Sequence, residues 1–317
     1  MTLATPLSET GHSMLERVQN LQGKICDAFF KFETEKSFFK DPWQRSETTG
    51  GGLSCVFEDG SIFEKAGVNI SAITGNLTSE TEKMMFQSLI NQRFKNSMQL
   101  ENATYFATGI SVVCHPINPF VPTIHMNYRF FEIQSGNETL WWFGGGTDLT
   151  PYFLDLDLIT QFHTQLKTTC DLFDLSYYPK FKDACDTYFY LPHRKEHRGI
   201  GGIFFDYLNT QSNQHYLDFA SACGNCFLDT YLPFIETYQA QPYTQSQQEW
   251  QQYRRGRYVE FNLLHDRGTH FGLKTNGRIE SIFMSLPKRV IWTYDENKLQ
   301  KEHDDLLKLI KTPKQWA

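Results

Sequence analysis

Apolar positions recur at helical spacing in several stretches of the chain. Between residues 14 and 36 they fall three or four apart, as at Leu15, Val18 and Leu21, which is the pattern of a helix with one buried face. The same reasoning predicts helices at 79–96, 155–173, 179–190, 213–238 and 296–311. Pro233 predicts a kink or break in the 213–238 helix, because proline lacks the N–H that a helix needs.

Other stretches show the composition and turn boundaries of β-strands. They are the runs 53–57, 61–65, 107–115, 123–133, 139–143, 199–207, 257–264, 269–273 and 279–286. The last three are joined by turn sequences around Gly268 and Gly277, which predicts a meander. Hairpin-linked strands with helices before, between and after them predict the α+β class, with a broad, mostly antiparallel β-sheet flanked by helices on both faces. No linker divides the chain, so residues 1–317 are predicted to form a single domain.

One pair of predicted strands carries polar side chains on a single face. Alternate residues of a strand share a face, so His125, Asn127 and Arg129 point the same way in the run 123–133. In the run before it, Ser111 and His115 share a face. Two interpretations stay open at this point: the polar face is solvated, or it is a covered surface that binds a ligand.

Charge and composition limit the kinds of ligand that the protein is expected to bind. The chain of 317 residues has a formal net charge of −6, so a chain-wide basic field for nucleic acid is absent. An acidic substrate would need a local group of arginines. The 27 Phe, 15 Tyr and 6 Trp fit either a large core or a pocket for a wide, flat, apolar ligand.

The expected environment is a reducing cytoplasm. Residues 1–10 lack the basic flank and apolar run of a signal peptide. No run reaches the roughly 18 apolar residues that span a bilayer, so we expect a soluble protein without a membrane span. The seven scattered cysteines do not form the pattern of a disulfide framework.

Five collinear motifs give the chain a specific resemblance. They are GISVVCHPINPFVPTIHMNYRFFE at 109–132, WFGGGTDLTP at 142–151, HRGIGGIFFD at 197–206, RRGRYVEFN at 254–262 and DRGTHFGLKTNGRIES at 266–281, followed by MSLP at 284–287. In these motifs the chain resembles the oxygen-dependent coproporphyrinogen oxidases. The resemblance is strongest over residues 51–294 and is far more specific than any one motif.

The resemblance implies a reaction. Members of this family convert the propionates on rings A and B of coproporphyrinogen III to vinyl groups, which gives protoporphyrinogen IX in haem biosynthesis. Molecular oxygen is the oxidant, and carbon dioxide and hydrogen peroxide leave. The resemblance also implies a broad antiparallel sheet between layers of helices, a deep substrate cleft against the sheet, and a homodimer. It implies that no organic cofactor is needed, and it allows a divalent metal that is not expected to be required.

The same resemblance assigns roles to individual residues. Asp206 is expected to accept hydrogen bonds from pyrrole N–H groups, and His125 to donate a proton. Arg129 and Arg278 are expected to bind propionates, since a guanidinium grips a carboxylate with two N–H groups. The other residues expected at the substrate are Ser111, Asn127, Tyr128, Asn276 and Gly277.

Position 207 departs from the family pattern. A second acidic residue usually follows the one that matches Asp206, whereas this chain has Tyr207. Strand alternation places Tyr207 on the opposite face of the sheet, so the prediction keeps Asp206 as the functional carboxylate.

Four histidines match family positions proposed to hold a metal. They are His115, His125, His163 and His193. Their spacing is not that of a compact ligand motif, and isolated histidines more often serve as hydrogen-bonding or acid–base groups. We therefore expect that a bound metal is not required.

Three local patterns are interpreted as structural. Cys223 and Cys226 have no second cysteine pair or redox setting. The glycines at 144–146 lack the lysine of a phosphate loop, so a tight turn or a close approach of backbone to ligand is expected. The basic run 254–257 is expected to end a helix at Gly256.

Two competing functions remain at the level of sequence. One is a porphyrin or haem carrier with the same cleft and no turnover. The other is a metal-dependent oxygenase that uses the histidines. For the homodimer, the predicted strands within residues 258–285 are the expected interface.

Overall fold

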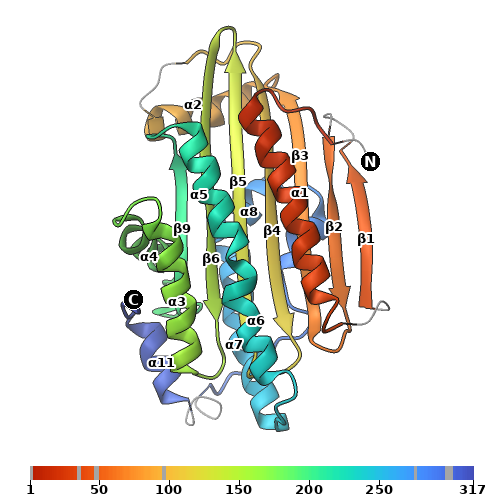
Figure 1. Cartoon of the computed structure of the whole chain (residues 1–317), viewed down its shortest axis with the longest axis vertical. Helices are drawn as coiled ribbons and strands as arrows, with labels where there is room; N and C mark the ends of the chain where they lie inside the picture. Colours follow the sequence, from red (N-terminus) through yellow and green to blue (C-terminus); the bar gives the residue numbers. More distant parts are fainter. Residues whose placement is uncertain (1–2, 34–36, 46–49, 95–97, 275–276, 297–302) are drawn as a thin grey trace.

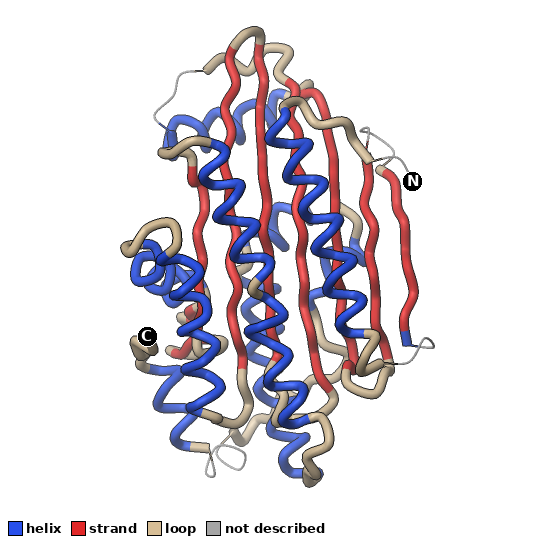
Figure 2. The backbone as a smooth tube through the Cα atoms, in the orientation of Figure 1, coloured by secondary structure: helices blue, strands red, loops and turns tan. Residues whose placement is uncertain are grey.

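One long antiparallel sheet runs through the whole molecule. The protein is described by a computed structural model that covers residues 3–317 apart from 34–36, 46–49, 95–97, 275–276 and 297–302. Seven strands follow the order β1-β2-β3-β4-β5-β6-β9, and every neighbouring pair is antiparallel (Figures 1 and 2). This confirms the α+β class and the mostly antiparallel sheet.

The strands of this sheet are long at its centre and shorter at its edges. They are β1 (Phe38–Gln44), β2 (Gly50–Glu58), β3 (Phe63–Asn76), β4 (Thr104–Pro116), β5 (Thr123–Ser135), β6 (Glu138–Thr150) and β9 (Gly201–Leu208). Two-residue strands β7 (Tyr190–Leu191) and β8 (Glu196–His197) pair separately. Short turns join β2 to β3 and β5 to β6, whereas helices lie between β3 and β4 and between β6 and β9.

Helices cover both faces, as the sequence predicts. In front in Figure 1 lie α1 (Glu9–Phe29), α3 (Leu156–Asp171), α5 (Asn213–Asn225) and α6 (Phe227–Tyr238), with α4 (Tyr177–Tyr188) and α11 (Asp304–Lys311) towards the β9 side. The back carries α2 (Glu80–Phe94), α7 (Gln245–Leu264), α8 (Arg267–Lys274), α9 (Ile279–Ile282) and the 3-10 helix η2 (Phe283–Ser285).

The main core lies between the sheet and the front helices. Ile124, Met126 and Phe130, which occupy even-numbered positions of β5, are almost fully buried there together with Leu21 and Ile25 of α1. Each large aliphatic side chain buried in this way stabilises the fold by about 1.5–3 kcal/mol. The apolar side chains of β5 therefore face the core, and its polar side chains project from the back face of the sheet.

The predicted meander at 257–286 is wrong, because this segment is helical. Thr244 begins α7 with a capping box to Gln247, and the helix continues to Leu264. Asp266 then accepts the Thr269 N–H at the start of α8 (2.7 Å). The helical period was hidden because three of the buried positions of α7 are arginines, which a hydrophobicity pattern counts as exposed.

Those arginines are Arg254, Arg255 and Arg257, and each is buried against a carboxylate. Arg254 binds Glu196 at 2.7 Å, and Arg255 binds Glu64 at 2.5 Å. Gly256 lies in the middle of α7. The basic run is therefore neither a helix end, as predicted, nor a surface patch.

Other element boundaries also differ from the prediction. The glycines at 144–146 lie inside β6, which continues to Thr150 rather than stopping at Phe143. The 213–238 helix breaks at Cys226, whereas Pro233 lies within α6. Of the predicted helix 296–311, only the part from Asp304 is found as a helix, and residues 297–302 lie outside the described residues. None of the helices in the described ranges is both long and apolar enough to cross a bilayer.

Candidate active site

The polar residues of β4 and β5 meet on the back face of the sheet. Ser111 pairs with Asn127 across the strands, and Gly109 pairs with Arg129. Directly opposite partners project to the same side, so the prediction of one shared polar face is confirmed. The side chains of His125 and Arg129 are 25% and 40% exposed, which leaves this face open to a ligand.

His125 is held by a neighbouring carboxylate. Asp148 of β6 stands opposite it in the register, and its Oδ1 lies 2.9 Å from His125 Nδ1. An ionised carboxylate only accepts hydrogen bonds, so His125 carries its proton on Nδ1 and donates it to Asp148. Nε2 is then the ring atom left for a ligand.

Asp148 is in turn anchored by Arg198, which comes just before β9. The guanidinium reaches both carboxylate oxygens, with Nη2 at 2.9 Å from each. Burial alone would raise the pKa of Asp148, but Arg198 and His125 outweigh burial and hold the pKa below its usual value. Asp148 therefore stays ionised, and Arg198 and Asp148 fix the orientation of the His125 ring.

Arg198 has an unusual environment for a charged side chain. It is 2% exposed, and its guanidinium lies over the rings of Phe189, Tyr258 and Phe261 at 4.0, 4.4 and 4.8 Å from the centroids. These cation–π contacts replace part of the lost hydration. Helix α7, which supplies Tyr258 and Phe261, thereby holds the His125 relay in place.

A second cluster lies beside this relay, two residues further along β5. Arg129 Nη1 donates to Asn127 Oδ1 (3.0 Å), and Arg129 Nη2 lies 2.9 Å from Asp206 Oδ1. Asp206 Oδ2 is 3.5 Å from Nη2 of Arg267, in α8. The structure thus brings the predicted Asn127, Arg129 and Asp206 into contact and adds Arg267.

Glycines form the floor between these polar groups. The cross-strand partners of Arg129 are Gly109 in β4 and Gly144 in β6. Gly146 of β6 is the partner of Asn127. A Cβ atom at Gly144 would lie 2.7 Å from Asp206 Oδ1 and 2.9 Å from Arg129 Nη2. A side chain here would separate the ion pair, so the glycine keeps the floor flat and the pair intact.

A β-bulge overturns the predicted orientation of Tyr207. Gly145 pairs with Phe205 and Phe143 with Leu208, so Asp206 and Tyr207 together face the single residue Gly144. Tyr207 has a left-handed φ of 57°. The bulge interrupts the alternation, and Tyr207 lies on the same face as Asp206, 6.1 Å from the Trp142 ring.

Comparison with known proteins identifies the family of this chain. The family model described as coproporphyrinogen III oxidase matches residues 13–316. The chain belongs to the coproporphyrinogen III oxidase family.

Individual relatives in this family are similar over nearly the whole chain. Identity is 46% over 310 residues to the oxygen-dependent coproporphyrinogen-III oxidase of Drosophila melanogaster, covering 96% of this chain and 78% of the relative. It is 45% over 305 residues to coproporphyrinogen-III oxidase 1, chloroplastic, of Arabidopsis thaliana, covering 94% and 77%. It is 44% over 300 residues to the mitochondrial enzyme of Homo sapiens, covering 93% and 65%.

Two predicted substrate residues lie away from the Arg129 cluster. Tyr128 points to the front, where it is buried in the main core and hydrogen-bonds Thr147 at 2.8 Å. Arg278 contacts Asp41 of the edge strand β1 at 2.5 Å. Its Nη1 atom is buried and has no hydrogen-bond partner among the described residues.

The two other predicted residues of this segment are less informative. The Gly277 N–H is already bonded to Gly272 O at 2.7 Å, so its backbone donor is used within the α8–α9 connection. Asn276 lies outside the described residues.

The four histidines considered as metal ligands do not come together. His115 contacts Thr123 and Ser285 O, and His163 contacts Tyr178 on the front face. His193 contacts Glu260. Within the described part of the chain, no three His, Cys, Asp or Glu side chains are grouped as a metal would require. A four-histidine site is therefore not what this geometry supports.

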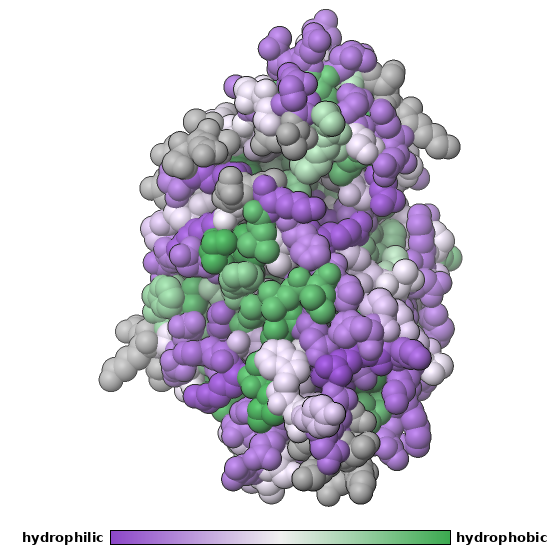
Figure 3. Space-filling view, turned by 180° about the vertical axis from the view of Figure 1, so that it is seen from behind, coloured by the Kyte–Doolittle hydropathy of each residue, from purple (hydrophilic) through white to green (hydrophobic). Residues whose placement is uncertain are grey.

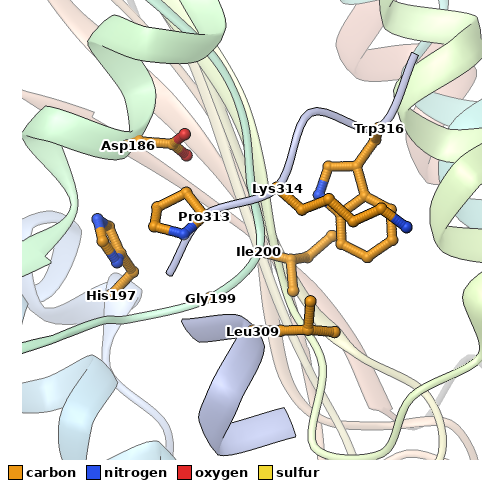
Figure 4. Close-up of a pocket in the computed structure, with 8 residues that line it drawn as sticks. All are labelled: Asp186, His197, Gly199, Ile200, Leu309, Pro313, Lys314 and Trp316. Atoms are coloured by element: carbon orange, nitrogen blue, oxygen red, sulfur yellow. The ribbon is translucent and has the colours of Figure 1, made fainter. Parts of the chain in front are cut away.

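A small pocket elsewhere does not involve the predicted residues. It lies between the start of β9, α4 and the C-terminal segment, and Figure 4 shows its lining. The lining residues are Asp186, His197, Gly199, Ile200, Leu309, Pro313, Lys314 and Trp316. The predicted site residues lie on the open back face of the sheet, not in this pocket.

Three functional partners escaped the sequence prediction: Asp148, Arg198 and Arg267. All three lie inside the motifs at 142–151, 197–206 and 266–281. Their position inside these motifs was thus the sequence signal that could have identified them. What sequence could not show was that they meet His125 and Asp206 across strands far apart in the chain.

Proposed function

We propose that this protein catalyses the oxygen-dependent oxidative decarboxylation of two propionates of coproporphyrinogen III, giving protoporphyrinogen IX for haem biosynthesis. The observation that carries the proposal is the pair of adjacent clusters on the glycine-lined back face. His125 is aligned by Asp148 and Arg198, and Asp206 is held between Arg129 and Arg267.

The overall reaction needs proton handling more than a fixed redox group. Each propionate loses carbon dioxide and two hydrogen atoms, and oxygen takes up those hydrogens as hydrogen peroxide. The protein must therefore orient a pyrrole and accept or return protons beside it. His125 Nε2 is the group proposed for proton transfer, and Asp206 Oδ2 is proposed to accept a pyrrole N–H.

Arginines on the same side of the sheet suit an anionic substrate. Arg129 is 40% exposed even while it contacts Asp206, and it is proposed to bind a propionate, with Asn127 and Ser111 beside it. Arg278 lies towards the β1 edge with a buried donor unpaired among the described residues. Its separation from Arg129 fits a wide substrate whose carboxylates point in different directions.

We propose that turnover needs oxygen and no organic cofactor, and that a divalent metal is not required. The support is that the carboxylates at this face already have partners: Asp148 is bound by His125 and Arg198, and Asp206 by Arg129 and Arg267. A metal-dependent oxygenase makes the contrasting prediction that a chelator abolishes turnover.

The test is aerobic turnover of coproporphyrinogen III by purified, chelator-treated protein, with Asp206→Ala and His125→Ala alongside. Protoporphyrinogen from the wild type, with a loss of about 100-fold or more in either variant, supports the oxidase. Binding without turnover supports a porphyrin carrier instead. Activity that returns only with added metal supports the oxygenase.

We also propose a homodimer formed through the 258–285 segment, whose described residues form helices instead of the predicted strands. Figure 3 shows apolar side chains gathered near the middle of the back face. The exposed apolar residues of α7–α9 are Leu263, Leu264, Phe271, Leu273 and Ile279. Sedimentation of the wild type and of Phe271→Glu tests this, and a monomeric wild type rejects it.

A cytoplasmic location stays a prediction. The human and Arabidopsis relatives carry the words mitochondrial and chloroplastic in their names, so relatives differ in compartment. Fractionation of cells that express the protein from its own gene decides the question.

A further inference from the structure

Arg93, near the end of α2, lies over the ring of Tyr207. Its guanidinium carbon is 5.0 Å from the ring centroid. Tyr207 is fixed from its other sides by Phe94 and Trp142, at 6.0 and 6.1 Å between ring centroids. The ring therefore forms a rigid platform for the arginine, directly after Asp206.

The bulge is what creates this platform. Without the extra residue between Phe205 and Leu208, alternation would turn the Tyr207 ring to the front of the sheet. A non-glycine residue at φ 57° is unfavourable on its own, and such conformations persist where the surrounding packing imposes them. Here the result is that α2 is linked to the Asp206 cluster through one aromatic ring.

The charge around this ring is unbalanced. Arg129 and Arg267 already share the single carboxylate of Asp206. Arg93 is exposed, and no carboxylate in the described ranges forms an ion pair with it. Burial and Asp206 raise the pKa of Tyr207, while the three arginines oppose them, so all four charges act on one phenol.

We propose that Arg93 is a further carboxylate-binding residue and takes one propionate of the substrate, with Tyr207 as its positioning residue. This rests on the proposed function. A guanidinium that lies over a ring face still has N–H groups to offer, and a carboxylate can accept two of them. Because the contact with the ring also restricts the side chain, less freedom is lost when the carboxylate binds.

The decisive measurement is anaerobic equilibrium binding, since without oxygen the substrate binds but does not react. The ligands are coproporphyrinogen III and four analogues, each with one propionate replaced by an ethyl group. Arg93→Gln is expected to weaken binding of the parent compound about tenfold, the effect of one charge-assisted contact. With one of the four analogues the wild type and Arg93→Gln should bind equally.

Lys83→Gln provides the matched control. Lys83 is on the same helix and contacts Glu80 outside the cluster, so its loss removes the same charge without removing the contact. Two results would show a long-range effect of positive charge rather than a direct contact, and would overturn the proposal. One is an equal loss of affinity in Lys83→Gln, and the other is the same loss of affinity in Arg93→Gln for all four analogues. Unchanged binding in Arg93→Gln would overturn the proposal as well.

Tyr207 variants separate positioning from packing. Tyr207→Phe keeps the ring face and should bind coproporphyrinogen III like the wild type. Tyr207→Leu should lose part of the affinity that Arg93 contributes. Thermal melting checks that Tyr207→Leu remains folded, and in an Arg93→Gln background the leucine should cause no further loss of affinity. A wild type that binds all five ligands without aerobic turnover contradicts the proposed oxidase activity. The binding comparison between wild type and Arg93→Gln would still test the role of Arg93.

Discussion

At the scale of single residues, the site depends as much on missing side chains as on present ones. Gly144 lies between Arg129 and Asp206 with no room for a Cβ atom. Neither β-propensity nor hydrophobicity would select glycine in the middle of a central strand. The residue is explained by the ion pair that passes over it.

Gly144→Ala should therefore reduce turnover without unfolding the protein. The methyl group would push Asp206 Oδ1 and Arg129 Nη2 apart, and we expect kcat/KM to fall about 10- to 100-fold, the loss typical of a misplaced catalytic group. Steady-state kinetics and thermal melting measure the two effects. Gly23→Ala is the control, because nothing lies within 4 Å of a Cβ at that position in α1; equal kinetics in both variants would contradict this account.

Asp148 should matter for stability as well as for orientation. Asp148→Asn leaves the buried charge of Arg198 without its partner, and breaking one side of a buried pair typically costs about 3–5 kcal/mol in the free energy of unfolding. Urea unfolding measures this cost. Asp59→Asn removes an exposed pair with Lys288 and should cost about 1 kcal/mol or less, so similar losses in the two variants would argue against a buried role for Asp148.

At the scale of elements, helix α7 connects several parts of the molecule through ion pairs. Glu260 accepts from Arg194, close to the β7–β8 turn, at 2.7 and 2.9 Å and lies 2.8 Å from His193. Burial opposes ionisation, but Arg194 and His193 outweigh it and lower the pKa of Glu260 to about 2. The carboxylate is thus a clamp between α7 and the short β7–β8 hairpin.

This clamp predicts a defined loss of stability in acid. A carboxyl whose pKa is depressed on folding contributes stability above its unfolded pKa, near 4.5, and loses it as the pH falls towards about 2. The difference in unfolding free energy between wild type and Glu260→Gln should therefore shrink across that interval. Urea unfolding at pH 6, 4 and 3 measures it, and a constant difference would mean that Glu260 is not selectively stabilised as an anion.

Sequence patterns predicted most elements where burial follows hydrophobicity. The strands β4 and β5 and the helices α3 and α4 lie close to their predicted positions, because apolar residues fill the side that faces the core. The prediction failed at α7, where buried arginines replace apolar residues, and at Tyr207, where one extra residue reverses the alternation. Both failures come from tertiary contacts that no local pattern records.

The candidate site was predictable in part for the same reason. One strand supplies His125, Asn127 and Arg129, so alternation alone groups them. Their partners Asp148, Arg198 and Asp206 come from other strands and the segment before β9, and only the sheet order brings these together. Tyr128 shows the converse: it stands between two site residues in sequence, yet alternation turns it into the core.

At the scale of the whole molecule, the two layers contain histidines that must stay neutral. His115 lies behind the sheet and His163 in front, and each is fully buried. Burial lowers the pKa of both well below 6.5, and the positive charges of Arg255 and Lys182 act in the same direction. The folded protein therefore resists protonation at two places that the unfolded chain exposes freely.

The two buried neutral histidines predict how the unfolding free energy of the whole protein responds to mild acid. Below pH 6.5 the unfolded chain binds up to two protons that the folded one does not, so the unfolding free energy should fall by up to about 2.7 kcal/mol per pH unit from these groups. In His163→Gln one of the two is removed, and the slope between pH 6.5 and 5 should drop by about half of that amount. His12→Gln, which removes an exposed histidine of α1, is the control for the loss of one imidazole. Urea titrations at closely spaced pH values give the slopes directly, and parallel curves for wild type and His163→Gln would show that the fold does not hold His163 neutral.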